Sequence, residues 1–274
     1  DVASITKSIT GILFARFLDD GRVRLDDPVS VAFPDYPTTG PQVPTFRDLF
    51  MHMSGLTGHG THGGVTNPHF ENVVLNGIDT LRPGTFYSYT GTGYDLAGKA
   101  METLSGRTAR RLLREDLFEP LGLGDIPVRS MSAGAQPTVW ELGVLAQWVA
   151  NRGSYGDREF VSEETFARML PRDYADLYPG VDVKGEPPYG LGLGAKTDRR
   201  APATPDAPPG EPIFGPNAVG HGALSQCVFR IDMDSQVVIT MIRKQGGKDF
   251  GAWITRLFTT VAVSTNCCVK SRRG

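Results

Sequence analysis

DVASITKSITGILFARFLDDGRVRLDDPV, residues 1–29, contains the most informative helix of the chain. Over residues 4–18 the apolar side chains recur at helical spacing, and Gly21 follows, so the pattern predicts a buried helix with a glycine after its end. Ser4 lies in the opening turn. Lys7 follows three residues later, which places both side chains on one helix face. A hydroxyl and an amine can therefore meet at the start of this helix.

This serine–lysine pair is typical of nucleophilic catalysis, but the spacing alone is weak evidence. A serine alcohol is a poor nucleophile until a neighbour accepts its proton, and a partly buried lysine with a lowered pKa can do so. The helix N-terminus also favours developing negative charge. Yet such a spacing arises about once by chance in a chain of this length. The alternative is a helix-capping serine beside a solvated lysine.

Composition favours a soluble globular protein. Among the 274 residues, 40% are hydrophobic and 21% are charged, which fits neither a disordered chain nor a membrane protein. The formal net charge is -2 and the basic residues are scattered, so no nucleic-acid partner is expected. No apolar stretch is long enough to predict a membrane span. Three cysteines, two of them adjacent, indicate no disulfide framework.

The rest of the chain alternates between helical and β patterns. Thr45 with Asp48, and Thr138 with Glu141, have the spacing of helix-capping pairs. Glycine and proline crowd residues 178–216, which predicts long loops around a short strand at 189–193. The expected helices are 46–53, 94–104, 109–117, 139–151 and one beginning at 250; the expected hairpin pairs 227–233 with 237–243.

Several segments, taken in order, resemble one known family. They are residues 1–29, TFRDLFMHMSGL (45–56), PGTFYSYTGTGYDLAGKAMETLSG (83–106), EPLGLGD (119–125), VWELGVLAQWVANRG (139–153) and VGHGALSQCVFRIDMDSQVVITMI (219–242). Together they resemble the class C β-lactamase and penicillin-binding-protein family of serine hydrolases, including its esterase branch. Several motifs in the right order are far more specific than any one of them.

The resemblance implies an α/β (α+β) fold of the β-lactamase/transpeptidase type. A central antiparallel sheet would be flanked by helices, with an all-helical lobe formed largely by residues 27–150 and a cleft between the two. Residues 1–274 would form a single catalytic domain. Only three residues precede Ser4, whereas the family has sheet strands there, so we expect a fragment that lacks those strands.

The family's second motif is tyrosine, any residue, asparagine, and its tyrosine acts as a base beside the lysine. Here it maps to Tyr89-Thr90-Gly91. A phenol has a pKa of about 10 in water, so we expect the positive charge of Lys7 to lower it. Gly91 departs from the motif: the amide that usually holds substrate and lysine is missing. This departure weakens the case for lactamase or peptidase activity.

The third motif maps to His221-Gly222-Ala223, and the resemblance implies that these residues and Gly91 contact the substrate. A histidine at this position resembles the esterase and amidase branches; the alternative is a strand histidine that is hydrogen-bonded in place. The backbone N–H groups of Ser4 and Leu224 would form the oxyanion hole. The Ala223 methyl would narrow the site.

Other histidines and glycines are assigned no chemistry. His52 is expected to pack structurally. His59, His62 and His69 have no companion ligands at familiar spacing, so no metal is predicted. Gly190, Gly192 and Gly194 imitate a dinucleotide-binding loop, but no helix pattern follows them. No cofactor is implied.

The sequence therefore predicts a serine hydrolase that forms an acyl-enzyme on Ser4, with Lys7 and Tyr89 moving the protons. The expected substrate is a small ester, amide or peptide, and a carboxylesterase is favoured. The alternatives are a D-alanyl-D-alanine carboxypeptidase or β-lactamase, and a catalytically silent relative that binds a ligand. The oligomeric state stays open. So does the compartment: periplasmic or secreted if a signal segment is missing, otherwise cytoplasmic.

Overall fold

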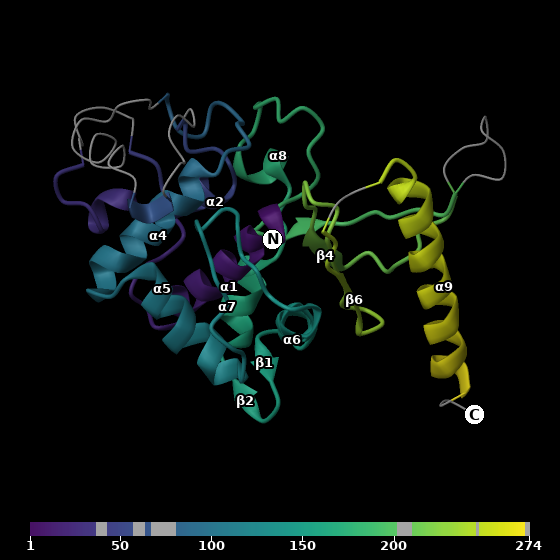
Figure 1. Ribbon diagram of the computed structural model, residues 1–274. Coiled ribbons are helices and arrows are strands. Elements are labelled where there is room, and N and C mark those ends of the chain that lie inside the picture. The colour runs from purple at the N-terminus through teal and green to yellow at the C-terminus, as the bar shows by residue number, and fades with distance from the viewer. Residues whose placement is uncertain (37–42, 57–63, 67–80, 202–209, 245–246, 272–274) are drawn as a thin grey trace.

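A computed structural model describes residues 1–36, 43–56, 64–66, 81–201, 210–244 and 247–271. It is a mixed α/β structure in which helices surround an antiparallel sheet (Figure 1). The predicted fold class is confirmed. Within the described residues, no helix combines the length and the apolar character needed to cross a bilayer.

The first helix runs through the centre of the molecule. A 3-10 turn, Ala3–Ile5, leads directly into α1, Thr6–Asp19, and twelve of the fourteen α1 residues are buried. The Phe14 ring lies 5.3 Å from that of Phe46 and 4.7 Å from that of Phe50, both in α2 (Phe46–Phe50). Phe50 in turn contacts Tyr94 in α4 (Thr92–Ser105) edge-on at 5.0 Å. These rings fix the start of α4 relative to α1.

The other helical segments before residue 151 are short, apart from α6. They are α5 (Ala109–Leu112), a π-helical turn (Leu113–Phe118), 3-10 turns at Val29–Val31, Gly64–Thr66 and Glu119–Leu121, and α6 (Val139–Ala150). Both predicted capping boxes, at Thr45 and Thr138, are present. Helix α2 ends at Phe50, three residues before its predicted end.

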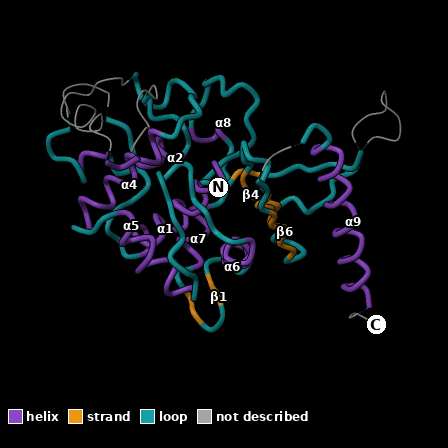
Figure 2. Tube along the Cα trace, viewed as in Figure 1, coloured by secondary structure: helices purple, strands orange, loops and turns teal. Residues whose placement is uncertain are grey.

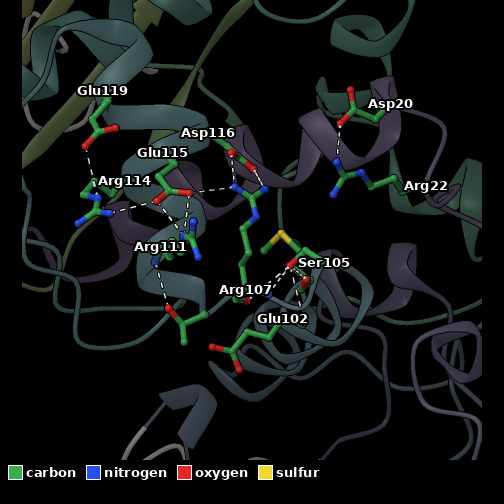
Figure 3. Close-up of polar contacts among 12 residues, drawn as sticks. Asp20, Arg22, Glu102, Ser105, Arg107, Arg111, Arg114, Glu115, Asp116 and Glu119 are labelled. Carbon is green, nitrogen blue, oxygen red and sulfur yellow. Dashed lines mark hydrogen bonds and ion pairs between the residues drawn. The ribbon is translucent and has the colours of Figure 1, made fainter.

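Charged side chains link α4 to the helical turns that follow it. Figure 3 shows the Arg107 guanidinium directed at Glu115 and Asp116, with Arg111 reaching the same Glu115. Arg107 Nη1 donates to Asp116 Oδ1 at 2.7 Å. The Arg107 and Asp116 side chains are about three-quarters buried, so this network restrains the end of α4 and the turns after it more than an isolated surface pair would.

The main sheet has the order β3-β4-β5-β6, and each neighbouring pair is antiparallel. Its strands are β3 (Gly194–Ala195), β4 (Ala218–His221), β5 (Val228–Asp232) and β6 (Val237–Met241). The predicted hairpin is β5–β6. A two-stranded sheet pairs β1 (Ser154–Tyr155) with β2 (Arg158–Glu159), and α7 (Glu163–Met169) and α8 (Tyr174–Leu177) follow.

Helices cover both faces of the main sheet. On one face Val219, Phe229 and Ile231 join the core that contains α1 and α6. On the other face Ala218 and Ile239 pack with Phe258 of α9 (Phe250–Ser271). Figures 1 and 2 show α9 on the far side of the sheet from the other helices. Helix α6 contacts β5 and β6. Of the residues 27–150 that were predicted to form largely a separate helical lobe, those of α6 therefore lie on the sheet.

The predicted strand at 189–193 is a tight loop instead. Tyr189 forms single bridges to Arg172 and Gly194, and Gly190 N–H donates to the Leu193 carbonyl at 2.8 Å. The loop packs directly on α1. A Cβ on Gly11 would lie 2.0 Å from the Leu191 carbonyl oxygen, so the helix and the loop approach more closely than any larger residue permits.

Candidate active site

Ser4 lies in the 3-10 turn that opens the first helix and is partly exposed. The residue before it, Ala3, has a φ of 45°, a conformation that costs a non-glycine residue free energy. Neighbouring bonds hold this turn: Thr6 Oγ1 donates to the Ala3 carbonyl at 2.7 Å, and Val2 N–H donates to the Ala135 carbonyl at 2.9 Å. The serine hydroxyl is therefore presented from a fixed backbone.

Lys7 lies one turn further along, and its side chain is buried. Its Nζ is 3.3 Å from Ser4 Oγ and donates to the Ser132 carbonyl at 3.0 Å. The ammonium also faces the rings of Tyr89 and Tyr94, at 4.8 and 5.6 Å from their centroids. Burial lowers the pKa of Lys7 to about 8, and the charge of Asp95 opposes this shift. About a tenth of the amine is therefore neutral at pH 7, far more than for a lysine with the ordinary pKa.

Tyr89 precedes α4 and is half-exposed. The Ser4 side chain is a hydrogen-bonding neighbour of its phenol and lowers its pKa, so a residue far along the chain reaches Ser4 and Lys7, which share one helical turn. The expected direction of its pKa was wrong: burial raises the Tyr89 pKa above its ordinary value, and the Ser4 bond counteracts this only in part. Lys7 is consequently the more available base near neutral pH, because its lower pKa leaves a larger fraction of it deprotonated.

Asp95 belongs to the site and carries no role in the sequence prediction. It is fully buried in the first turn of α4. Met131 N–H donates to Asp95 Oδ1 at 2.7 Å and Ser132 Oγ donates to Oδ2 at 3.4 Å. Burial raises the Asp95 pKa to about 7. The sequence did offer one indication that Asp95 belongs to the site: it lies four residues after Gly91, on the same face of a predicted helix.

His221 ends β4, and both of its ring nitrogens have partners. Nδ1 lies 2.5 Å from the Gly222 carbonyl oxygen and Nε2 lies 2.9 Å from the Tyr189 hydroxyl. The Tyr94 hydroxyl in turn donates to Tyr189 at 3.3 Å. Burial lowers the His221 pKa to about 3, so the ring is neutral. Tyr189 was missed because it reaches the site from the loop that packs on α1.

The turn after β4 is the open side of the site. Gly222 is exposed, Ala223 is partly buried, and the Leu224 side chain is 95% exposed. Gln226 N–H donates to the Ala223 carbonyl at 2.8 Å and closes the turn. Cys227 Sγ lies 3.9 Å from the Asp1 carbonyl oxygen, which brings this turn to the chain segment that precedes Ser4.

His52 lies beneath Tyr89. It is buried, with its ring centroid 4.4 Å from that of Tyr89, and its carbonyl accepts from Ser88 N–H at 2.9 Å. Burial holds its pKa well below the ordinary value. His59, His62 and His69 lie outside the described residues. Among the residues that are described, no group of three potential metal ligands occurs.

The structure gives a packing reason for Gly192, one of the three alternating glycines at 190–194. Its φ is +70°, and a Cβ there would lie 2.2 Å from the Lys7 carbonyl oxygen. Ser8 Oγ donates to the Gly192 carbonyl at 2.5 Å. The glycines therefore let the loop pack against the helix that carries Ser4 and Lys7.

Comparison with known proteins places this geometry in a family. The family model described as Beta-lactamase matches residues 1–258. The chain belongs to the beta-lactamase family. Its curated relatives include carboxypeptidases, penicillin-binding proteins and esterases, so the family is one of serine hydrolases.

Three relatives of this beta-lactamase-family chain illustrate that range. Penicillin-binding protein 4 of Amycolatopsis lactamdurans is 32% identical over 44% of this chain and 33% of its own. The D-alanyl-D-alanine-carboxypeptidase/endopeptidase AmpH of Escherichia coli K12 is 29% identical, over 45% and 35%. The esterase/beta-lactamase LipL of Mycobacterium tuberculosis is 28% identical, over 54% and 35%. The matches thus cover about a third of each relative.

Solved structures share the fold. A penicillin-binding protein homologue from Caulobacter crescentus superposes with a TM-score of 0.70 at 20% identity, covering 96% of this chain and 82% of that one. A family VIII carboxylesterase gives 0.64 at 16% identity, with the same two coverages. In this beta-lactamase-family chain, Ser4, Lys7 and Tyr89 lie together, while His221 is tied to Tyr189.

Proposed function

We propose that the chain is a serine hydrolase that cleaves esters through a covalent acyl-enzyme on Ser4. The observation that carries this proposal is the distance of 3.3 Å between the buried Lys7 Nζ and the partly exposed Ser4 Oγ. A lysine with a pKa of about 8 can take the serine proton at physiological pH. The Tyr89 phenol contacts the same hydroxyl.

The reaction begins when Ser4 Oγ bonds to the carbonyl carbon of the ester. The serine proton moves to the Lys7 amine, directly or through the Tyr89 phenol. When the bond to the leaving oxygen breaks, that proton goes to the departing alkoxide and an alcohol leaves. Water then attacks the acyl carbon and gives a proton to the same base. The bond between that carbon and Ser4 Oγ breaks, the base returns the proton to Ser4 Oγ, and the acid leaves.

Two backbone N–H groups, those of Ser4 and Leu224, are proposed to bind the oxyanion. The fixed turn at Ser4 supports the first assignment, and the closed turn after β4 supports the second. Loss of one such donor typically costs about 3 kcal/mol of barrier. Gly222 and Ala223 would contact the substrate on the β4 side, and Gly91, the residue before α4, would contact it from the α4 side.

A carboxylesterase is favoured over a carboxypeptidase or a lactamase. His221 is neutral and both its nitrogens are occupied, so position 221 offers no positive charge to a substrate carboxylate. Gly91 offers no amide. A neutral ester needs neither group. The name of LipL, an esterase/beta-lactamase, is in keeping with this choice.

Turnover of p-nitrophenyl butyrate by the wild type and by Ser4→Ala tests the proposal. We expect the substitution to lower kcat/KM at least about 1000-fold, with circular dichroism unchanged. Ser264→Ala, at an exposed position of α9, is a control serine outside the proposed chemistry. Retention of most of the turnover by Ser4→Ala would reject the assignment. A D-alanyl-D-alanine peptide and a fluorescent penicillin, assayed in parallel, separate the esterase from the alternative hydrolases.

A further inference from the structure

The buried carboxylate of Asp95 joins two elements that enclose Lys7. From α4 it accepts the Met131 N–H at 2.7 Å and faces Ser132 Oγ at 3.4 Å. The Ser132 carbonyl, in the same short segment, accepts from Lys7 Nζ at 3.0 Å. Thr10 of α1 holds this segment from the other side, donating to the Met131 carbonyl at 2.6 Å. The wall around the lysine is therefore fixed by α1 and α4 together.

The charge of Asp95 reaches the same lysine. Asp95 is the anion that raises the Lys7 pKa against burial. Gly91 lies one helical turn earlier, where Asp95 N–H donates to its carbonyl at 3.1 Å, and contributes no side chain. The other titratable groups that face Lys7 are uncharged at neutral pH, because burial raises the pKa of the phenols and lowers that of the imidazoles; they are Tyr89, Tyr94, His52 and His221.

We propose that Asp95 is a positioning residue that sets the proton affinity of Lys7 and holds the Ser132 carbonyl against it. The inference rests on the proposed function for its catalytic meaning, but the contacts that join Asp95 to Lys7 through the Met131–Ser132 segment are present whether or not Ser4 reacts.

The sign of the effect follows from the two opposing influences. Burial favours the neutral amine of Lys7, and the Asp95 carboxylate favours the ammonium. Without that negative charge, Lys7 loses its proton at a lower pH. Activity that requires neutral Lys7 rises as pH increases through the Lys7 pKa, so removal of the charge moves this rise toward acid.

The experiment measures the pH profile of kcat/KM for Asp95→Asn, which keeps an oxygen able to accept the Met131 N–H. We expect the acid limb to move down by about one pH unit and KM to change little. Asp19→Asn is the matched control: Asp19 accepts two bonds from Ser162 at the far end of α1 and should leave the limb in place. A lower rate with an unmoved limb would show a merely structural role and overturn the proposal.

A second readout does not depend on activity. The ¹³Cε resonance of Lys7, assigned with Lys7→Met, reports its pKa by NMR. A lower pKa in Asp95→Asn supports the coupling even if Ser4 proves inert, in which case the proposed function alone fails. If Asp95→Asn does not fold, the carboxyl ¹³C of Asp95 is titrated in the wild type and in Lys7→Met. Because the coupling is reciprocal and the Lys7 charge lowers the Asp95 pKa, a higher Asp95 pKa in Lys7→Met supports the proposal, and the same pKa in both proteins overturns it.

Discussion

The two sides of the candidate site are built in different ways. On the α1–α4 side, Lys7 is buried and bonded to the Ser132 carbonyl, and Asp95 binds the same segment from a second helix. On the β4 side, the turn at 222–226 is closed by its own backbone, and the Leu224 side chain is 95% exposed. The first side is held by long-range contacts and the second mainly by local ones.

This difference suggests a division of labour. Proton transfer requires fixed distances and tuned pKa values, which burial and cross-linking provide on the α1–α4 side. Substrate recognition tolerates an open, locally held turn. Substitutions on the buried side should therefore act on kcat and stability, whereas those on the β4 turn should act on KM.

The largest effect is expected from Lys7→Met, which keeps the buried shape and removes the amine. We expect kcat to fall about 1000-fold, because the proton acceptor is lost. Steady-state turnover of p-nitrophenyl butyrate measures this. Lys99→Met, on the exposed part of α4 where Lys99 pairs with Glu102, should keep full activity. Equal activity of Lys7→Met and Lys99→Met would show that the buried lysine has no part in proton transfer and would contradict the proposed difference between the two sides.

Tyr89→Phe should have the next largest effect. Loss of the phenol that contacts Ser4 is expected to lower kcat about 100-fold, the usual scale of a proton-transfer group. Tyr155→Phe, in β1 and away from the site, is the control. If Tyr89→Phe raised KM while kcat stayed constant, Tyr89 would be a substrate contact instead.

Gly192→Ala tests the rigidity of the buried side through stability. The new methyl group would meet the Lys7 carbonyl oxygen, at a residue whose φ is +70°. We expect the free energy of unfolding to fall by about 3 kcal/mol, from clash and backbone strain combined. Gly21→Ala has a similar φ of +67° but nothing nearby, so it should cost about 1 kcal/mol. Urea unfolding gives both values, and equal losses would contradict close packing at Gly192.

The smallest effect is expected from Leu224→Ala. The truncated side chain is almost fully exposed and leaves the backbone N–H in place, so KM for a butyrate ester should rise only about threefold, with kcat unchanged. A large fall in kcat would show that the turn takes part in the chemistry beyond its backbone, and would remove the distinction between the two sides.

Local patterns predicted much of this arrangement. Residues three apart on one helix predicted that Ser4 and Lys7 meet, and the capping pairs at Thr45 and Thr138 located two helix starts. Asp95 and Tyr189 were beyond such reasoning, because their contacts come from segments brought together by tertiary packing. The Tyr89 pKa was expected in the wrong direction because sequence reveals a nearby charge more readily than burial.

The most direct test of Ser4 as the activated nucleophile is covalent labelling with a fluorophosphonate. The folded protein should acquire one adduct, located by peptide mass spectrometry on Ser4, and labelling should become at least about 100-fold slower in Lys7→Met. Folded wild-type protein that remains unlabelled at Ser4, or that reacts equally fast without the lysine, would contradict the account.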